Sequence, residues 1–183
     1  MTSELQILPI AVYQAQLLSD LAKKIYIPHY PYLWNEGGID WYINEYAYPV
    51  EKISKEIADS NNLHFIVYLN KEPIGYLKLN INANSKGFDP NTTLELERIY
   101  ILNTCIQKGV GTQLVNFTKA IAAKYHKKEI ILKAMDSATR ALEFYKKNGF
   151  EVVGDFQLPA HIFTLMKPAY RGMYVLKHAL PIL

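Results

Sequence analysis

Residues 96–114 read LERIYILNTCIQKGVGTQL, an apolar strand pattern that leads into two glycines one residue apart. From Gly109 to residue 126, apolar side chains recur every three or four positions, which predicts a helix that begins at the glycines. Residues 129–135, EIILKAM, have the apolar run of a buried strand. The order strand, helix, strand predicts a β-α-β unit over residues 93–135, and such a unit requires at least one parallel strand pair.

The flanking sequence predicts further strands and helices on both sides of this unit. Pro28 and Pro31 are expected to stop the first helix, and Gly149 is expected to close the last one. The fold class is therefore α/β (α+β), with about seven strands that are mostly antiparallel and one hairpin at Asn70-Lys71-Glu72. We expect strands at 4–10, 64–69, 73–81, 93–102, 129–135, 150–156 and 171–180, and helices at 11–26, 50–57, 109–126 and 137–149.

Length and composition restrict the class of protein. A chain of 183 residues, half of them hydrophobic and a fifth charged, is typical of one soluble globular domain, here residues 1–183. A net charge of +3 with interspersed signs does not indicate nucleic-acid binding. Cys105 is the only cysteine, so no intrachain disulfide can form. No stretch approaches the ~20 apolar residues of a membrane span, and the N-terminal residues lack a signal-peptide pattern, so we expect a cytoplasmic protein without membrane partners.

The glycine pair can be interpreted in two ways. The first backbone N–H groups of a helix lack intrahelical partners, and glycine lets a phosphate approach them, so residues 107–112 could hold a pyrophosphate. Taken alone, the pair more readily indicates a tight turn between strand and helix. A P-loop is excluded because no G-x-x-x-x-G-K-[ST] is present, and a dinucleotide fingerprint is excluded because Leu114 stands at its third glycine.

A second motif extends this pattern. Residues 96–114, followed by ATRALEFYKKNGFEVVG at 138–154, resemble the GCN5-related N-acetyltransferase (GNAT) superfamily, whose motif is a strand, Q/R-x-x-G-x-G/A at a helix start, and A-x-x-F-Y-x-x-x-G-F downstream. The resemblance covers roughly residues 63–155, and LELERIYI with FYKKNGF looks most like the bacterial spermidine/spermine N-acetyltransferases. It implies a sheet that splays around acetyl-CoA. It also implies transfer of an acetyl group to a primary amine of a small molecule, with a polyamine as the first candidate, by direct attack in a ternary complex.

The resemblance also implies which residues hold coenzyme A. The main chain of Ile99, Tyr100 and Ile101 is expected to bind the pantetheine arm as a further strand would. Ile106 stands where the family usually has Gln or Arg, so that Gln107 substitutes in part, and Ala138 stands where an Asn is common. The remaining expected cofactor contacts are Gln107, Lys108, Gly109, Val110, Gly111, Thr112, Ala138, Ala141 and Phe144.

Two side chains are candidates for the catalytic chemistry. Tyr145 matches a tyrosine that in many relatives protonates the leaving thiolate, and a phenol with its ordinary pKa near 10 is protonated at neutral pH. Glu97 matches a glutamate of polyamine acetyltransferases, and could bind the ammonium and pass its proton away, directly or through water. Strand alternation predicts that Glu95 and Glu97 share one face with Ile99 and Ile101. The alternatives are a core aromatic for Tyr145 and solvated carboxylates for the two glutamates.

An aromatic stretch at residues 32–48 precedes the second predicted helix. The family usually builds its acceptor pocket there, and aromatic faces attract ammonium groups, so Trp34, Trp41 and Tyr42 join Glu95 as expected substrate-binding residues. Core packing is the alternative for each of the three aromatics. The histidines are too scattered for a metal site, and we expect no metal; they are His29, His64, His126, His161 and His178.

Two other functions remain open on the sequence. The chain could acetylate a protein N-terminus or a lysine, for which an open acceptor groove would be expected instead of a closed pocket. It could also bind coenzyme A without catalysis, since polar residues are absent at Ile106 and Ala138. Whether the chain forms a homodimer is likewise open.

Overall fold

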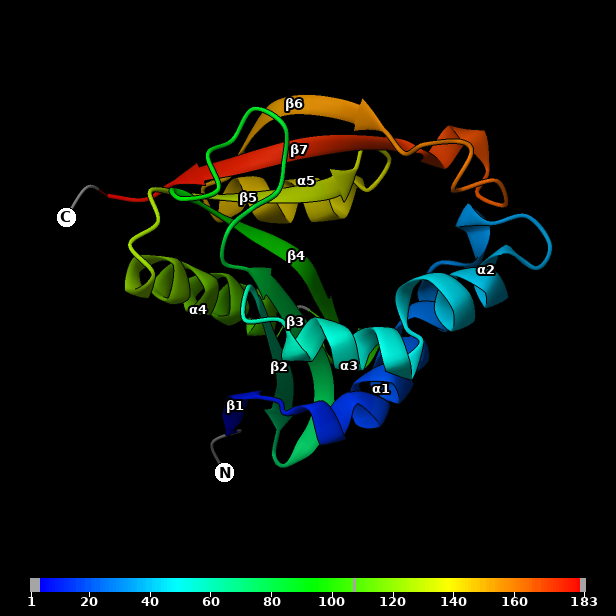
Figure 1. Cartoon of the computed structure of the whole chain (residues 1–183), viewed down its shortest axis with the longest axis horizontal. Helices are drawn as coiled ribbons and strands as arrows, with labels where there is room; N and C mark the ends of the chain where they lie inside the picture. The colour runs from blue at the N-terminus through cyan, green and yellow to red at the C-terminus, as the bar shows by residue number, and fades with distance from the viewer. Residues whose placement is uncertain (1–3, 107, 182–183) are drawn as a thin grey trace.

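Within residues 4–106 and 108–181, which the computed structural model describes, the chain forms a seven-stranded mixed sheet with helices on both faces (Figure 1). The strand order is β1-β2-β3-β4-β5-β7-β6. The pair β4 and β5 is parallel, and the other five pairs are antiparallel. The predicted fold class is confirmed, including the parallel pair around the β-α-β unit.

The elements follow the predicted ones closely. The strands are β1 (Leu5–Pro9), β2 (Asn62–Leu69), β3 (Glu72–Asn80), β4 (Thr93–Ile101), β5 (Glu129–Met135), β6 (Glu151–Gln157) and β7 (Gly172–Ala179). The helices are α1 (Ala15–His29), α2 (Gly38–Trp41), α3 (Val50–Ala58), α4 (Val110–Lys124) and α5 (Thr139–Lys147), with a π-helical turn at Tyr42–Ala47 and short 3-10 turns at Val12–Gln14, Pro31–Leu33, Asn103–Cys105 and Pro168–Tyr170.

One predicted boundary was wrong. The sequence indicated that Pro28 stops the first helix, but α1 includes it and ends at His29. A proline in the last turn removes a single backbone hydrogen bond, and the N–H of Tyr30 still donates to the carbonyl of Tyr26 at 3.2 Å. The loss is therefore small enough for the helix to continue to its natural end.

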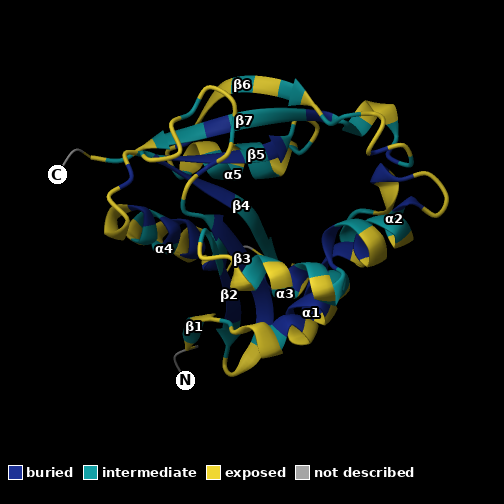
Figure 2. Ribbon diagram, in the orientation of Figure 1, coloured by how far each residue is buried: buried dark blue, intermediate teal, exposed yellow. Residues whose placement is uncertain are grey.

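Two apolar layers hold the helices to the sheet. Helices α1 and α3 pack on one face, where Leu18, Ile53 and Tyr76 are buried, and helices α4 and α5 lie against the other. Figure 2 shows the central strands buried between these layers, while the outer surfaces of the helices are exposed. Residues with alternating apolar side chains, such as Leu94 and Leu96 in β4, pack against the α4 face.

Strands β4 and β5 separate part-way along their length. In the described part of the chain their register runs from Thr93 opposite Glu129 to Leu96 opposite Leu132 and then stops. Strand β4 continues to Ile101, paired with β3 on its other edge. The edge of residues 97–101 that faces β5 is therefore free of ladder partners, and an opening begins beyond Leu96 and Leu132.

A β-bulge lies where this opening begins. Lys78 of β3 pairs with Arg98, and Leu79 pairs with Leu96, so Glu97 is an extra residue in β4. The bulge shifts the alternation of side chains along the strand. Glu95 and Glu97 stay together on the α1 and α3 face, where both accept hydrogen bonds from the amide of Asn80.

The prediction that Ile99 and Ile101 share the face of the two glutamates was therefore wrong. Both isoleucines pack against the clusters on the α4 side. Tyr100 packs into the cluster on the opposite face, against α1. Strict alternation fails here because the extra residue at Glu97 changes the phase by one position.

A search of the described helices, in residues 4–106 and 108–181, finds none with the length and apolarity needed to cross a membrane.

Candidate active site

The start of α4 follows the free end of β4 after a short connection that contains the 3-10 turn Asn103–Cys105. Gly109 is the N-cap residue of α4 and has a φ of 76°, a left-handed conformation that glycine adopts at little cost. Among the described residues, nothing lies within 4 Å of a Cβ built at this position. The N–H groups at the start of a helix have no intrahelical acceptor, so this open space faces backbone donors at the positive end of the helix dipole.

The second glycine of the motif brings α5 against α4. A Cβ built at Gly111 would lie 3.0 Å from Cζ of Phe144, which is too close for an unshifted neighbour. Ala138 is the N-cap residue of α5, and Ala141 is half-buried one turn further. The structure therefore brings Phe144 of α5 against the glycine motif, and it also gives Gly111 a packing role.

The other expected contacts in this loop differ in exposure. Lys108 and Thr112 are exposed, whereas Val110 is buried in an apolar cluster with Val67 and Leu114, so only its main chain can face a ligand. Gln107 lies outside the described residues. Ile106 is 45% exposed, so an apolar side chain stands in solvent where a polar family residue is usual.

A coenzyme A molecule fits these features of the chain. The open space at Gly109 leaves room for a pyrophosphate beside free N–H groups. The free edge at Ile99, Tyr100 and Ile101 offers main-chain donors and acceptors to an amide-containing arm. The side chains of Ile99 and Ile101 are directed into the core, which agrees with a main-chain role.

Tyr145 belongs to α5 and packs against Phe144 and Phe150, at ring centroid separations of 5.2 Å and 5.9 Å. Burial raises the pKa of Tyr145 above its ordinary value, and the nearby phenol of Tyr30 raises it further. Since Tyr30 follows α1, the hydroxyl of Tyr145 interacts electrostatically with a residue from the opposite face of the sheet. The phenol is therefore fully protonated at neutral pH and can donate a proton or a hydrogen bond.

Glu97 is held by three donors. Its Oε2 lies 2.7 Å from Nζ of Lys78 and 2.8 Å from Nδ2 of Asn80, and its Oε1 lies 3.3 Å from Arg98. Burial would raise the pKa of Glu97, but Arg98, Lys78 and Asn80 together lower it below its ordinary value. The carboxylate is therefore ionised and is a weak proton acceptor.

A chain of charged groups extends from Glu97 in both directions. Glu56 of α3 lies 3.1 Å from Lys78 and 3.4 Å from Arg98, which connects α3 to the sheet. On the other side, Asn80 donates to Glu95 at 3.1 Å, and Lys133 of β5 pairs with Glu95 at 2.7 Å. The carboxylates of this network are Glu56, Glu95 and Glu97, and its cations are Lys78, Arg98 and Lys133, so the formal charges balance.

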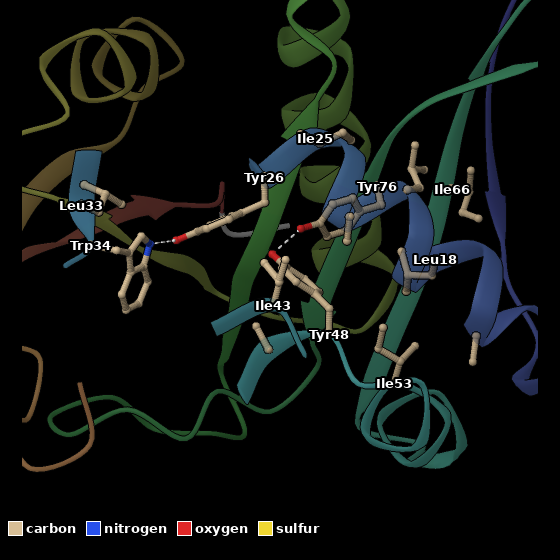
Figure 3. Close-up of a cluster of buried hydrophobic side chains, with 14 of the residues drawn as sticks. Leu18, Ile25, Tyr26, Leu33, Trp34, Ile43, Tyr48, Ile53, Ile66 and Tyr76 are labelled. Atoms are coloured by element: carbon tan, nitrogen blue, oxygen red, sulfur yellow. Dashed lines mark hydrogen bonds between the residues drawn. The ribbon is translucent and has the colours of Figure 1, made fainter. Parts of the chain in front are cut away.

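Of the expected substrate-binding aromatics, Trp34 belongs to a buried apolar cluster (Figure 3). Trp41 and Tyr42 are partly buried and pack against the same cluster. Trp34 is 4% exposed, and its indole N–H donates to the hydroxyl of Tyr26 at 3.3 Å. The ring of Tyr42 stacks on Tyr26 at 4.7 Å and lies 4.9 Å from Trp34, and Trp41 stacks on Tyr46 at 5.2 Å. These ring faces are largely covered by other rings, which agrees with the packing alternative.

Three tyrosines at this place were not singled out by the sequence, namely Tyr26, Tyr30 and Tyr76. Tyr76 and Tyr100 are cross-strand partners that stack at 5.3 Å, and Tyr48 shares a 2.6 Å hydrogen bond with Tyr76. Tyr26 and Tyr30 are one helical turn apart, and their rings lie 4.6 Å from each other. The available signal was their periodicity within the helix and the strands. Their convergence from distant segments is a tertiary feature.

Among the described residues, no group of three or more His, Cys, Asp or Glu side chains is arranged to hold a metal ion.

Comparison with known proteins agrees with this geometry. The model of the acetyltransferase (GNAT) family matches residues 23–150. The chain belongs to this family. A curated GNAT relative, an uncharacterized N-acetyltransferase of Lactobacillus delbrueckii subsp. lactis, is 29% identical over 116 residues, which are 63% of this chain and 64% of the relative.

Solved GNAT structures show the same fold. The PaiA N-acetyltransferase of Thermoplasma acidophilum, crystallised with coenzyme A, superposes with a TM-score of 0.75 at 21% identity, over 97% of this chain and 99% of that chain. A chimera of the spermidine N-acetyltransferase of Vibrio cholerae superposes with a TM-score of 0.70 at 18% identity, over 97% and 96% of the two chains. Enzymes of the GNAT family use acetyl-CoA.

Proposed function

We propose that this protein transfers the acetyl group of acetyl-CoA to a primary amine of a small molecule, by direct attack in a ternary complex. The observation that carries the proposal is the opening between β4 and β5. Its free strand edge, the glycine start of α4 and the protonated Tyr145 supply the binding and acid chemistry that such a transfer needs.

The main chain of residues 97–101 and the N–H groups after Gly109 would hold the donor. The donor supplies a thioester, whose carbonyl carbon accepts the amine nitrogen. The pairing of β4 with β5 ends at Leu96, which leaves main-chain N–H groups of the free edge available to the carbonyl oxygen.

Tyr145 is the proposed general acid. As the carbon–sulfur bond breaks, its hydroxyl donates a proton to the thiolate, and the proton lost by the amine nitrogen restores the balance through solvent. The raised pKa of Tyr145 keeps the group protonated before the transfer.

Glu97 is proposed to act on the amine through its charge. Since its pKa is lowered by Lys78, Arg98 and Asn80, the carboxylate remains ionised and stabilises the incoming ammonium. The amine proton then leaves through water and not by direct transfer to Glu97.

Cys105 supports direct transfer rather than an acyl-enzyme. The thiol is buried with Val67, Ile74 and Val110, so it is not exposed to the thioester of a bound donor. An acyl-enzyme would also require a base beside the thiol.

A polyamine remains the acceptor class predicted from the position of Glu97, and a spermidine N-acetyltransferase is among the structures with this fold. Among the described residues, the charged network around Glu97 contains three carboxylates and three cations, so it carries no excess negative charge for a polycation. We therefore propose the broader class of small primary amines.

A thiol-release assay with acetyl-CoA tests the proposal. The acceptors are polyamines, monoamines, amino acids and peptides, and the Cys105→Ala variant is the control for direct transfer. We expect release with a small amine and unchanged release by Cys105→Ala. Release with peptides alone would favour a protein acetyltransferase, and coenzyme A binding without release would favour a non-catalytic protein. Loss of all activity in a folded, cofactor-binding Cys105→Ala variant would contradict direct transfer.

A further inference from the structure

A cavity lies on the face of the sheet that carries Glu95 and Glu97. It has a volume of about 570 Å³ and is formed between residues 84–88, which connect β3 to β4, and strands β5, β7 and β6. Figure 1 shows this connection crossing in front of β5 and β7. Its volume is in the range of ligand-binding pockets, which is roughly 300–1,000 Å³.

The cavity adjoins the candidate active site through Lys133. This residue lines the cavity and is the first of β5 beyond the last ladder pair with β4. Its ammonium lies 2.7 Å from Glu95, and Asn80 joins Glu95 to Glu97 by hydrogen bonds of 3.1 Å and 2.8 Å. A molecule that reaches Glu97 with its amine can therefore extend its other end into this cavity.

The roof of the cavity is fixed by a buried lysine. Nζ of Lys127 donates to Oδ1 of Asn82 at 2.7 Å, to the carbonyl of Pro90 at 2.9 Å and to the carbonyl of Asn91 at 3.1 Å. These bonds tie both ends of the connection to the segment after α4. The cavity is therefore formed before any ligand arrives, which reduces the entropy cost of binding.

The floor of the cavity contains a glycine that the backbone does not require. Gly154 of β6 is paired with Val175, and its φ lies outside the left-handed region. Among the described residues, nothing lies within 4 Å of a Cβ built there. A glycine inside a strand costs stability relative to residues with a side chain. The absence of a side chain at Gly154 keeps the floor of the cavity open.

The lining is apolar with balanced charge. Phe88, Val153, Phe156 and Val175 supply hydrocarbon surface. The charged lining residues are Lys86, Lys133 and Asp155, and Lys133 is already paired with Glu95. A second ammonium on the acceptor would therefore meet the carboxylate of Asp155 and the ammonium of Lys86, and would lose part of its hydration against the apolar walls.

From these observations, and resting on the proposed function, we infer that this cavity binds the far end of the acceptor and selects a monoamine with an apolar body. The primary amine lies toward Glu97, and the hydrocarbon part lies on Gly154 and Val175. Acceptors that carry a second charge at the far end are used poorly.

Three acceptors of equal length test the selection, namely hexylamine, 6-aminohexanoate and hexane-1,6-diamine. We expect kcat/KM for hexylamine to exceed that for the diamine by about tenfold or more, since burying an unpaired charge is costly. A diamine that is used as well as hexylamine would overturn the inference.

The Gly154→Leu variant tests whether the hydrocarbon part of the acceptor lies in this cavity. Its side chain would fill the cavity without backbone strain, so kcat/KM for hexylamine should fall about tenfold, while ethylamine and the KM for acetyl-CoA are unaffected. The matched control is Val152→Leu, on the same strand, 41% exposed and outside the lining. Equal activity of the two variants with hexylamine would overturn the inference.

Calorimetric binding of hexylamine in the presence of coenzyme A separates this inference from the proposed function. If no amine supports thiol release, but hexylamine binds the native protein and binds Gly154→Leu at least tenfold more weakly, the proposed function fails and the cavity assignment stands. If hexylamine binds both proteins equally, the cavity assignment fails whether or not acetyl transfer occurs.

Discussion

Glu97 lies at the opening of the site, but its carboxylate already accepts hydrogen bonds from other side chains, which is unusual for a catalytic base. It lies at the opening of the site as the extra residue of a bulge, and it is held by Lys78, Asn80 and Arg98. Such a carboxylate loses much of its basicity but keeps a fixed position and a full negative charge. Its contribution at the residue scale is therefore electrostatic, and the acid chemistry falls to Tyr145.

The Tyr145→Phe variant tests that assignment. Removal of the hydroxyl leaves the ring contacts with Phe144 and Phe150 in place, so folding and coenzyme A affinity should be retained. We expect kcat to fall by about 10²-fold or more, the usual effect of losing a general acid. The readouts are steady-state kinetics and calorimetric titration with coenzyme A. An unchanged kcat under conditions where chemistry limits the rate would remove Tyr145 from the mechanism.

At the scale of elements, the start of α4 joins sequence to function most directly. Gly109 ends the connection from β4 and permits the left-handed turn, and Gly111 lets Phe144 of α5 approach. A tight turn and a cofactor site were separate interpretations of these glycines. The structure shows that the turn is present, and that it leaves open space beside free N–H groups.

The Gly109→Ala variant has a matched control at Gly37. Both glycines are N-cap residues with φ near 75°, at 76° and 73°, and neither has a described neighbour within 4 Å of a built Cβ. Alanine should cost about 1 kcal/mol of stability at each position because of the left-handed backbone. Only Gly109→Ala should also weaken coenzyme A binding, by about tenfold or more, as measured by calorimetry. Equal coenzyme A affinities of the two variants would contradict the proposed cradle.

At the scale of the whole molecule, a buried histidine links folding to pH. The side chain of His64 is 1% exposed, and neither ring nitrogen has a hydrogen-bond partner among the described residues. Burial, followed by the charges of Lys78 and Arg98, lowers the pKa of His64 from 6.5 to about 3. Below pH 6.5 the unfolded chain binds a proton that the folded chain does not bind, so acid favours unfolding.

The free energy of unfolding should therefore decrease as pH falls from about 6.5 toward 3, with a slope of up to ~1.4 kcal/mol per pH unit from this group. Urea denaturation at pH 5 and pH 7 measures the slope. His64→Leu should lower the slope by the amount that corresponds to about one proton taken up on unfolding, whereas the exposed control His161→Leu should leave the slope unchanged. An unchanged slope in His64→Leu would show that the imidazole is charged in the folded protein.

The sequence predicted most of the fold because each element carries a local signal. Strand β5 has the predicted bounds, 129–135, and Gly149 closes α5 with a φ of 86°. The bulge at Glu97 has no such local signal in the sequence. It results from the pairing of Leu96, the neighbour of Glu97 in β4, with Leu79 of β3. A single extra residue was sufficient to place Ile99 and Ile101 on the opposite face from the one predicted.

The candidate site was predictable only in part for the same reason. The glycines and Tyr145 stand in motifs, but Lys78 and Asn80, two partners of Glu97, come from β3, which folding brings beside β4. The aromatic stretch indicated a pocket by composition, yet Trp34 and Tyr42 pack on Tyr26, a residue of another helix. Side chains that converge from distant segments require the tertiary structure.

The attachment by Lys127 also suggests a route to altered enzymes. Lys127 donates hydrogen bonds to Asn82, Pro90 and Asn91. The five residues that cover the cavity lie between these anchors, and this segment, 84–88, can therefore be exchanged as a unit. The anchors stay in place, and the donor-holding start of α4, on the opposite face of the sheet, is untouched. A library confined to this segment would diversify amine preference while leaving the thioester chemistry constant.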